Sequence, residues 1–261
     1  METRQGVQYP YGVNAETPPP SLESALDRGS ARGRLAALLE VILCSDYPTQ
    51  IVLGATFTAL GIRPLLSTGG LNPSYVVGLS LADAALLIGL IVLFLRARGE
   101  PPLALFLGRR RVGPEVRAGL PLVGWAFLVA LAVLVPIQQF APWMRTVQSN
   151  PLQDLIRTPG GAAVFAVVVV LAGGVREELQ RAFLLHRFEQ HLGGPRVGLV
   201  VSSAAFGAGH LLQGADAAAA TAVLGAFWGA IYLRRRSVIA PVVSHAGFNL
   251  LQIAQFLTVG R

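Results

Sequence analysis

The sequence contains no lysine, a single cysteine and few charged residues of either sign. Cys44 has no second cysteine with which to form an intrachain disulfide. Only 13% of the 261 residues are charged, whereas 53% are hydrophobic, and the mean hydropathy is +0.56. Soluble domains of this size have about 25% charged residues. The composition therefore excludes an ordinary soluble domain and indicates an integral membrane protein.

All 21 basic residues are arginine, and the formal net charge is +7. These arginines gather at the ends of apolar runs, as expected for a cytoplasmic rim that faces anionic lipid. That arrangement explains the pI of about 10.7 better than nucleic-acid binding does, so we expect the lipid bilayer as a partner and no nucleic acid.

Apolar runs of about 20 residues predict an all-α, polytopic membrane bundle of about six to eight transmembrane helices. A short helix over residues 35–44 precedes the run 51–62. The further expected spans are residues 75–95, 118–140, 161–188, 197–212, 217–233 and 238–259. No internal repeat or heptad pattern is visible. We expect residues 1–30 to be a disordered cytosolic tail without a signal peptide, and residues 31–261 to be one helical membrane domain.

The arginine clusters alternate with the spans and so predict an orientation. By the positive-inside rule, the N-terminus is cytoplasmic and the C-terminus lies outside, in a bacterial plasma membrane. Counted from the nearest arginine cluster, Glu177, His210 and His245 lie at roughly 15, 21 and 14 Å along their helices. Three helices thus bring polar side chains to a similar depth, and we expect these to line one cavity that opens toward the cytoplasm.

Five polar residues interrupt the last spans: Glu177, Glu178, His210, His245 and Asn249. Ionisable groups are costly in hydrocarbon and persist where they function or find partners. Phe206 and His210, like His245 and Asn249, are spaced i, i+4 and share one helix face.

A carboxylate and an imidazole in a cavity of low dielectric constant can take a proton from water. A second histidine and a carboxamide could stabilise the oxyanion that forms when this water attacks an amide carbonyl. Arg181, four residues after Glu177, would neutralise and orient that carboxylate. The residues therefore favour a hydrolase.

At these positions the chain resembles the CAAX prenyl protease and bacteriocin-processing (CPBP, or Abi) intramembrane endopeptidases. Members carry Glu-Glu-x-x-x-Arg, Phe-x-x-x-His and His-x-x-x-Asn/Asp on successive membrane helices, and the last two motifs match at Phe206–His210 and His245–Asn249. The resemblance covers residues 161–259. It implies a glutamate and His210 that activate water, with His245 and Asn249 as the oxyanion site. It also implies a membrane-associated protein or peptide as the substrate. We expect no cofactor and no metal, although two histidines and a glutamate on separate helices leave an adventitious metal open.

The first motif departs from the family spacing, because only two residues separate Glu178 from Arg181. If Arg181 is held fixed, Glu177 falls on the family's second glutamate and Arg176 on its first, the one that activates water. In a regular helix Glu177 shares its face with Arg181, and Glu178 is turned away by about 100°. A π-bulge would instead rotate Glu178 inward. We favour Glu177 as the essential carboxylate, with Glu178 as the alternative.

Other functions remain open at this point. The glutamates could form a structural ion pair in a non-catalytic scaffold or immunity-type member of the family, and a proton-coupled transporter could use the same groups as a relay. A zinc protease is disfavoured because the chain has no His-Glu-x-x-His, and a serine protease because no carboxylate orients a base near Ser202 or Ser203. Asp83, inside a span, is expected to form an interhelical hydrogen bond. The sequence does not indicate an oligomeric state.

Overall fold

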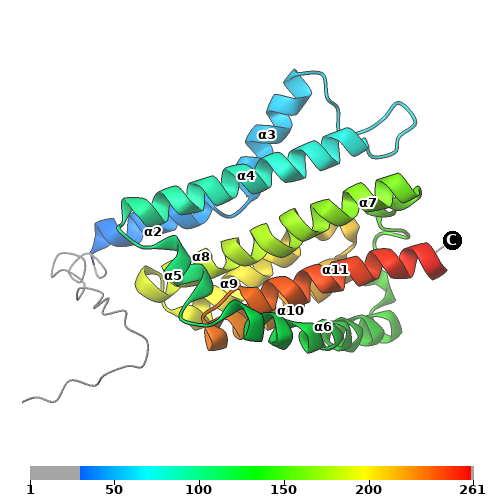
Figure 1. The fold of residues 1–261 in the computed structure, drawn as a ribbon. Helices are drawn as coiled ribbons and strands as arrows, with labels where there is room; N and C mark the ends of the chain where they lie inside the picture. The colour runs from blue at the N-terminus through cyan, green and yellow to red at the C-terminus, as the bar shows by residue number, and fades with distance from the viewer. Residues whose placement is uncertain (1–29, 260–261) are drawn as a thin grey trace, which may run out of the picture.

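The computed structural model describes residues 30–259, and these residues form a helical bundle with no strand among them (Figure 1). The predicted all-α class is therefore confirmed. The helices are α2 (Ala31–Leu43), α3 (Tyr47–Ala59), α4 (Pro73–Ala97), α5 (Pro102–Leu107), α6 (Val112–Phe140), α7 (Pro159–Val168), α8 (Glu177–His191), α9 (Pro195–Ala208), α10 (Ala215–Arg235) and α11 (Ile239–Val259). A π-helix, η3 (Val169–Arg176), joins α7 to α8, and three short 3-10 turns lie at Pro142–Met144 (η1), Pro151–Ile156 (η2) and Leu211–Gln213 (η4).

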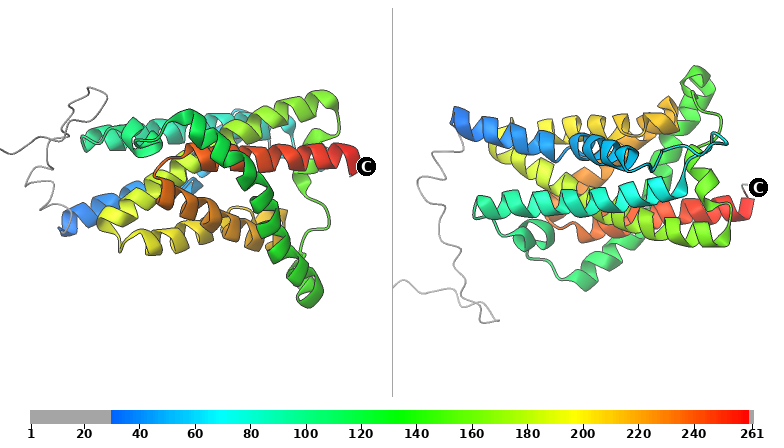
Figure 2. Two further views of the ribbon diagram at one scale, coloured as in Figure 1. Left: turned by 60° about the horizontal axis from the view of Figure 1, so that its bottom comes forward. Right: turned by 90° about the horizontal axis from the view of Figure 1, so that it is seen from above.

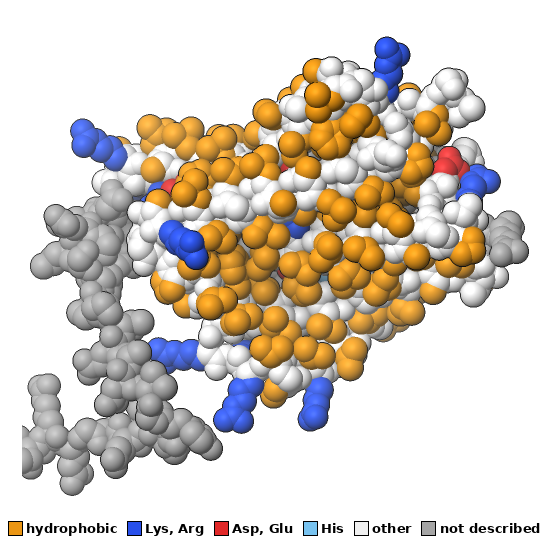
Figure 3. All heavy atoms as spheres, turned by 45° about the horizontal axis from the view of Figure 1, so that its top comes forward, with side chains coloured by type: hydrophobic (Ala, Val, Ile, Leu, Met, Phe, Trp, Pro, Cys, Tyr) orange, Lys and Arg blue, Asp and Glu red, His pale blue; other side chains and the backbone are white. Residues whose placement is uncertain are grey.

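Among residues 30–259, five helices are long and apolar enough to cross a membrane, or six if the bent pair α2 and α3 counts as one span. Six is the lower end of the predicted range of six to eight, and five lies below it. The difference lies in α9, which has 14 residues rather than the predicted run 197–212. Hydrophobic side chains cover the flank of the bundle (Figure 3), as an integral membrane protein requires. The predicted tail, residues 1–30, lies outside the described residues except for Ser30.

Most arginines lie at one end of the bundle, here called the arginine-rich end. The two rotated views in Figure 2 show the helices running between the same two ends. At the arginine-rich end α4, α8 and α10 finish, and α2, α6, α9 and α11 begin (Figure 1). The arginines of that end are Arg32, Arg34, Arg96, Arg98, Arg109, Arg110, Arg111, Arg117, Arg187, Arg196, Arg234, Arg235 and Arg236. The connections at the opposite end carry only Arg63, Arg145 and Arg157 among the described residues.

The long helix that carries the glutamates begins at Pro159, and Thr158 is its N-cap. The Thr158 hydroxyl accepts a hydrogen bond from the Gly161 backbone N–H at 3.1 Å, and Pro159 occupies the first turn, where its missing N–H is not needed. The helical segment then continues to His191 through the π-helix η3, for 33 residues. The predicted helix over residues 161–188 is thus present, with a change of helical phase in its middle.

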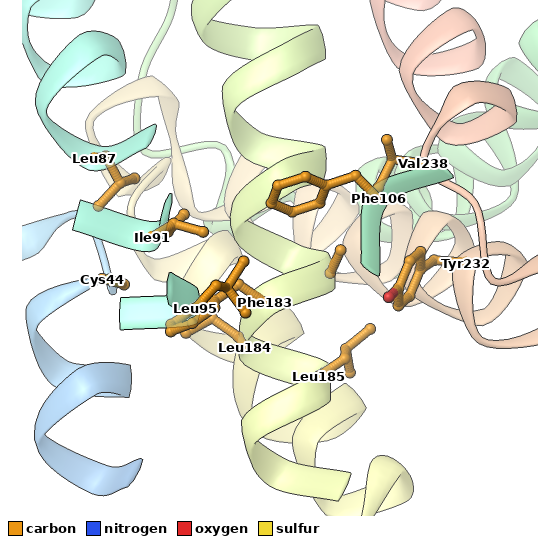
Figure 4. Close-up of a cluster of buried hydrophobic side chains, with 11 residues drawn as sticks. Cys44, Leu87, Ile91, Leu95, Phe106, Phe183, Leu184, Leu185, Tyr232 and Val238 are labelled. Carbon is orange, nitrogen blue, oxygen red and sulfur yellow. The ribbon is translucent and has the colours of Figure 1, made fainter. Parts of the chain in front are cut away.

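A hydrophobic cluster fixes α8 within the bundle. Phe183, Leu184 and Leu185 of α8 pack against residues of α4, α5 and α10, as Figure 4 shows. The other members are Cys44, Leu87, Ile91, Leu95, Phe106, Ala182, Tyr232 and Val238. This cluster fills the space toward the arginine-rich end. It therefore fixes the position of the first turns of α8, which lie farther from that end.

The α2–α3 pair bends by 43° where the chain passes Cys44, Ser45 and Asp46. Asp46 has φ 81°, a left-handed conformation that is uncommon for a residue other than glycine. Two hydrogen bonds fix the break to the bundle: Gln180 Nε2 donates to the Cys44 carbonyl at 2.8 Å, and the Tyr47 hydroxyl donates to the Ala205 carbonyl at 2.8 Å. Beyond the break, α3 leans away from the other helices (Figure 1).

Candidate active site

Two glycines bring the π-helix close to α11. A Cβ added to Gly174 would lie 2.8 Å from the Cβ of Ala246, and one added to Gly173 would lie 2.8 Å from Nδ2 of Asn249. At Gly174 only glycine permits this approach, since the added Cβ would also lie 3.3 Å from the Cα of Ala246, whereas the Asn249 side chain opposite Gly173 could move. The close packing places the start of α8 beside the α11 turn that carries His245 and Asn249.

Glu178 is buried and doubly bound. Its Oε1 accepts a hydrogen bond from Arg181 Nη1, and Nδ1 of His245 lies 2.8 Å from the same oxygen. Its side chain is 1% exposed, so this carboxylate is closed off from the cavities described below. The carboxylate therefore serves to hold Arg181 and His245.

Glu177 points in a different direction. Its Oε1 lies 3.7 Å from Arg176 Nη2, and its Oε2 lies 3.6 Å from His245 Nε2. The side chain is 13% exposed and lines both cavities of the site. Glu177 is the carboxylate that a bound molecule can reach.

The ion pair of Arg181 differs from the one predicted. Arg181 contacts Glu178 at i, i+3 and not Glu177 at i, i+4, so that prediction is wrong. The segment from Glu177 onward is regular α-helix, and the π-helix ends before it. In a regular helix both i+3 and i+4 neighbours are within reach. Here the contact of the guanidinium with the Phe206 ring, 4.7 Å from the centroid, accompanies the i+3 pairing.

His245 is held on two sides. Its ring stacks on Trp228, with the centroids 3.8 Å apart and the planes 15° apart. Trp228 is itself fixed, because its Nε1–H donates to the Ser244 hydroxyl at 3.1 Å. A carboxylate accepts hydrogen bonds, so Nδ1 of His245 is the donor toward Glu178, and Nε2 is left on the side of Glu177.

His210 lies in the turn after α9. Its Nδ1 is 2.9 Å from the Phe206 carbonyl, which can only accept, so Nδ1 carries a proton and Nε2 of the neutral ring has a free lone pair. Phe206 lies between the histidines: its ring centroid is 4.9 Å from that of His210 and 6.1 Å from that of His245. Both imidazoles thus stand edge-on to one phenyl ring.

Two cavities meet at these residues. The first has a volume of about 620 Å³ and is lined by Glu177, His210, His245 and Asn249 together. The second, of about 970 Å³, lies beneath the α2–α3 break. Residues that line both are Val76, Ser80, Leu152, Arg176, Glu177, Phe206, His210 and Gln213. Glu177 and His210 therefore stand at the junction of the two spaces.

Neither cavity extends toward the arginine-rich end. Their linings reach the connections at the opposite end, through Gly69, Gly70, Asn150 and Gln213, and include no residue of the connections at the arginine-rich end. The prediction of a cavity opening toward that end is therefore wrong. The physical reason is the cluster in Figure 4, which fills the interior there.

Two further contacts at the site were not predictable from the sequence. The first is the stacking of the Trp228 ring on His245. Asp46 lies in a break between helices, and its carboxylate reaches Arg176 at 3.1 Å. The predicted role of Asp83 changes: its Oδ2 lies 3.8 Å from Arg176 Nε, an interhelical ion pair. Within residues 30–259, no group of three or more histidine, cysteine, aspartate or glutamate side chains is arranged to hold a metal ion.

The matched motifs and their convergence on one cavity agree with the comparison to protein families. Residues 159–251 match the family described as type II CAAX prenyl endopeptidase Rce1-like. These residues form an Rce1-like domain of the CPBP (Abi) family. The Rce1-like domain begins at α7 and ends within α11, so it includes all seven residues singled out from the motifs. No curated protein and no solved structure matches the chain.

Proposed function

We propose that the protein is an intramembrane endopeptidase in which Glu177 and His210 activate a water molecule for attack on a peptide bond. The observation that carries this proposal is the position of Glu177 and His210 at the junction of two cavities, with His245 and Asn249 lining the first. A carboxylate and an imidazole lone pair that face one space are the groups needed for general-base catalysis.

The two glutamates have separate roles in this proposal. Glu177 takes the proton from water, because it is the member of the pair that lines the cavities. Glu178 binds Arg181 and His245 and keeps both in place. The resemblance to the family, in which one glutamate activates water, supports this division.

His245 and Asn249 would bind the oxyanion. The Glu178 carboxylate fixes the orientation of the His245 ring, which leaves Nε2 free to donate when it is protonated. Asn249 is half-buried, lines the first cavity and can donate through Nδ2. Two fixed donors beside a developing negative charge are the usual form of an oxyanion site.

Internal cleavage follows from the two cavities. A substrate bound across their junction has room for chain on both sides of the cleaved bond, as an endopeptidase requires. The substrate class that we propose is a membrane-associated protein or peptide, because the cavities lie among helices that are apolar enough to cross a membrane.

The test is cleavage of a peptide library by purified protein in detergent micelles. We expect loss of cleavage in Glu177→Gln and His210→Ala, by about 10²-fold or more, since each variant removes a proton acceptor. Glu189→Gln, which changes an exposed carboxylate on the same helix that lines neither cavity, is the matched control and should cleave normally. Wild-type rates in Glu177→Gln would contradict the proposal and favour the non-catalytic scaffold.

A further inference from the structure

Arg176 directly precedes the glutamates and is not among the seven residues singled out from the motifs. Its side chain is 7% exposed, and it is the nearest cation to Glu177. A buried arginine has to be compensated by several acceptors, since the cost of removing its charge from water is large. The partners of Arg176 are therefore informative.

Each part of the guanidinium faces a different element. Nη1 lies 3.1 Å from Asp46 Oδ2 and donates to Gln180 Oε1 at 3.1 Å, Nη2 faces Glu177, and Nε faces Asp83 of α4. The planar fork of arginine suits this arrangement, because its donors point in fixed directions. Asp46 and Asp83 both come from helices before residue 159, outside the Rce1-like domain.

Two features show that this arrangement has a cost. Asp83 is 1% exposed, and the nearest guanidinium nitrogen is 3.8 Å from it, which is longer than a hydrogen bond. Asp46 has a positive φ of 81° at the helix break, a conformation that is unfavourable for a residue with a Cβ. Costly conformations that persist beside a reactive group suggest a role in that group's function.

We propose that Arg176 is a positioning residue that fixes the charge and direction of the Glu177 carboxylate, and that Asp46 and Asp83 hold Arg176 for this purpose. The proposal rests on the proposed function, because it assigns Arg176 a role only if Glu177 is the base. It makes the N-terminal helices α3 and α4 part of the machinery.

Ionisable groups approach Glu177 from all the elements around it except α10, which presents Trp228. They are Arg176, Glu178 and Arg181 along its own helix, Asp46 at the α2–α3 break, Asp83 on α4, His210 after α9 and His245 on α11. Among these, Asp46 and Asp83 both face the Arg176 guanidinium, and Asp46 also acts directly on the Glu177 carboxylate. Removing the arginine and removing one of its aspartates should thus affect the Glu177 charge in opposite directions.

The experiment measures the pH dependence of kcat/KM in four variants. In Arg176→Gln the charged form of Glu177 loses its neighbouring guanidinium. The acid limb, which is the low-pH side of the kcat/KM profile, therefore moves to higher pH, and kcat falls by about 10²-fold. In Asp83→Asn, Arg176 keeps its charge but loses a competing carboxylate, so the acid limb moves to lower pH. Arg176→Lys should rescue the charge but not the geometry, with the acid limb near its normal position and kcat still reduced.

The matched control is Arg187→Gln, a fully buried arginine on the same helix that pairs with Glu40 and Glu100 and does not line either cavity. It should lose stability but keep the wild-type pH profile. Unmoved acid limbs in Arg176→Gln and Asp83→Asn, or shifts equal to those of the control, would overturn the proposal. If Arg176→Gln does not fold, Asp83→Asn alone decides.

Glu177→Gln is measured in parallel and separates the two proposals. An inactive Glu177→Gln together with unmoved acid limbs would remove the positioning role and leave the proposed function intact. An active Glu177→Gln, or a wild-type protein that cleaves no peptide, would remove both.

Discussion

Glu177 and Glu178 are neighbours in the chain but have different surroundings. Glu178 is 1% exposed and compensates the buried guanidinium of Arg181, whereas Glu177 is 13% exposed and its closest ion-pair distances are 3.6 and 3.7 Å. The Glu178 carboxylate is thus important for folding, and the Glu177 carboxylate is available for reaction. This contrast leads to a prediction that does not depend on knowing a substrate.

We expect Glu178→Gln to lower the free energy of unfolding by about 3 kcal/mol, because it leaves Arg181 buried with less compensating charge. Glu177→Gln should cost clearly less, since its ion pairs are longer and more exposed. Thermal unfolding of both variants in the same detergent measures the difference. Equal losses in the two variants would contradict the separation of roles.

The approach of the π-helix η3 to α11 is the feature that forms the site at the scale of secondary structure. Gly174 faces the backbone and Cβ of Ala246, one residue after His245. A side chain there meets the rigid part of a helix rather than the end of a flexible group. The two elements can only respond by moving apart.

Gly174→Ala should therefore reduce the stability by about 1–3 kcal/mol and should also reduce activity, as His245 and Asn249 move away from Glu177. Gly124→Ala is the matched control, because nothing lies within 4 Å of a Cβ added at that position of α6. The control should be neutral or gain roughly 0.5–1 kcal/mol from the better helix former. Unfolding and cleavage of the two variants are compared; a stable and active Gly174→Ala would refute the argument.

The helices were predictable from the sequence because the bilayer thickness sets the length of each apolar run. The end of α9 was not, because Leu211 and Leu212 continue the apolar run after the helix has ended. The phase of η3 was not readable either, since a wider turn alters the hydrogen-bond ladder without altering the composition. The spacing alone was therefore enough to predict that Glu177, His210, His245 and Asn249 share one site. It was not enough to identify the ion-pair partner of Arg181, which is Glu178.

Contacts between distant segments were the least predictable part of the site. Asp46 and Arg176 are 130 positions apart, and the pair depends on the bend between α2 and α3. The stacking of Trp228 on His245 similarly depends on how α10 packs beside α11. Neither relation leaves a local pattern in the sequence.

A second ion network joins several helices across the arginine-rich end of the whole molecule. Arg187 of α8 is fully buried and contacts Glu40 of α2 and Glu100 of the α4–α5 connection, and His186 lies 3.4 Å from Glu100. Burial raises the pKa of Glu100, but hydrogen bonds from His186 and Arg187 outweigh it and lower the pKa to about 2 from 4.5. The carboxylate is therefore bound more tightly when it is charged.

A lowered pKa in the folded protein means that Glu100 stabilises the fold above pH 4.5, and that this contribution is lost as the pH falls toward about 2. We expect the Tm in detergent to fall over this range, and Glu100→Gln to flatten that part of the curve while lowering Tm at neutral pH. Asp154→Asn, whose ion pair is exposed, is the control and should retain the wild-type slope. An unchanged slope in Glu100→Gln would contradict the assignment.

Because Asp46 and Asp83 pair with Arg176, the segment that matches the family does not contain all the charged groups around Glu177. The segment recognised by sequence similarity begins at residue 159, yet two carboxylates near Glu177, the proposed base, come from earlier in the chain. If Glu177 is the base, the boundary of homology is not the boundary of the catalytic unit. The segment from residue 159 onward, grafted onto foreign helices, would keep every motif residue but leave the buried guanidinium of Arg176 without Asp46 and Asp83. Reassembling this chain from two separately expressed parts would restore both aspartates.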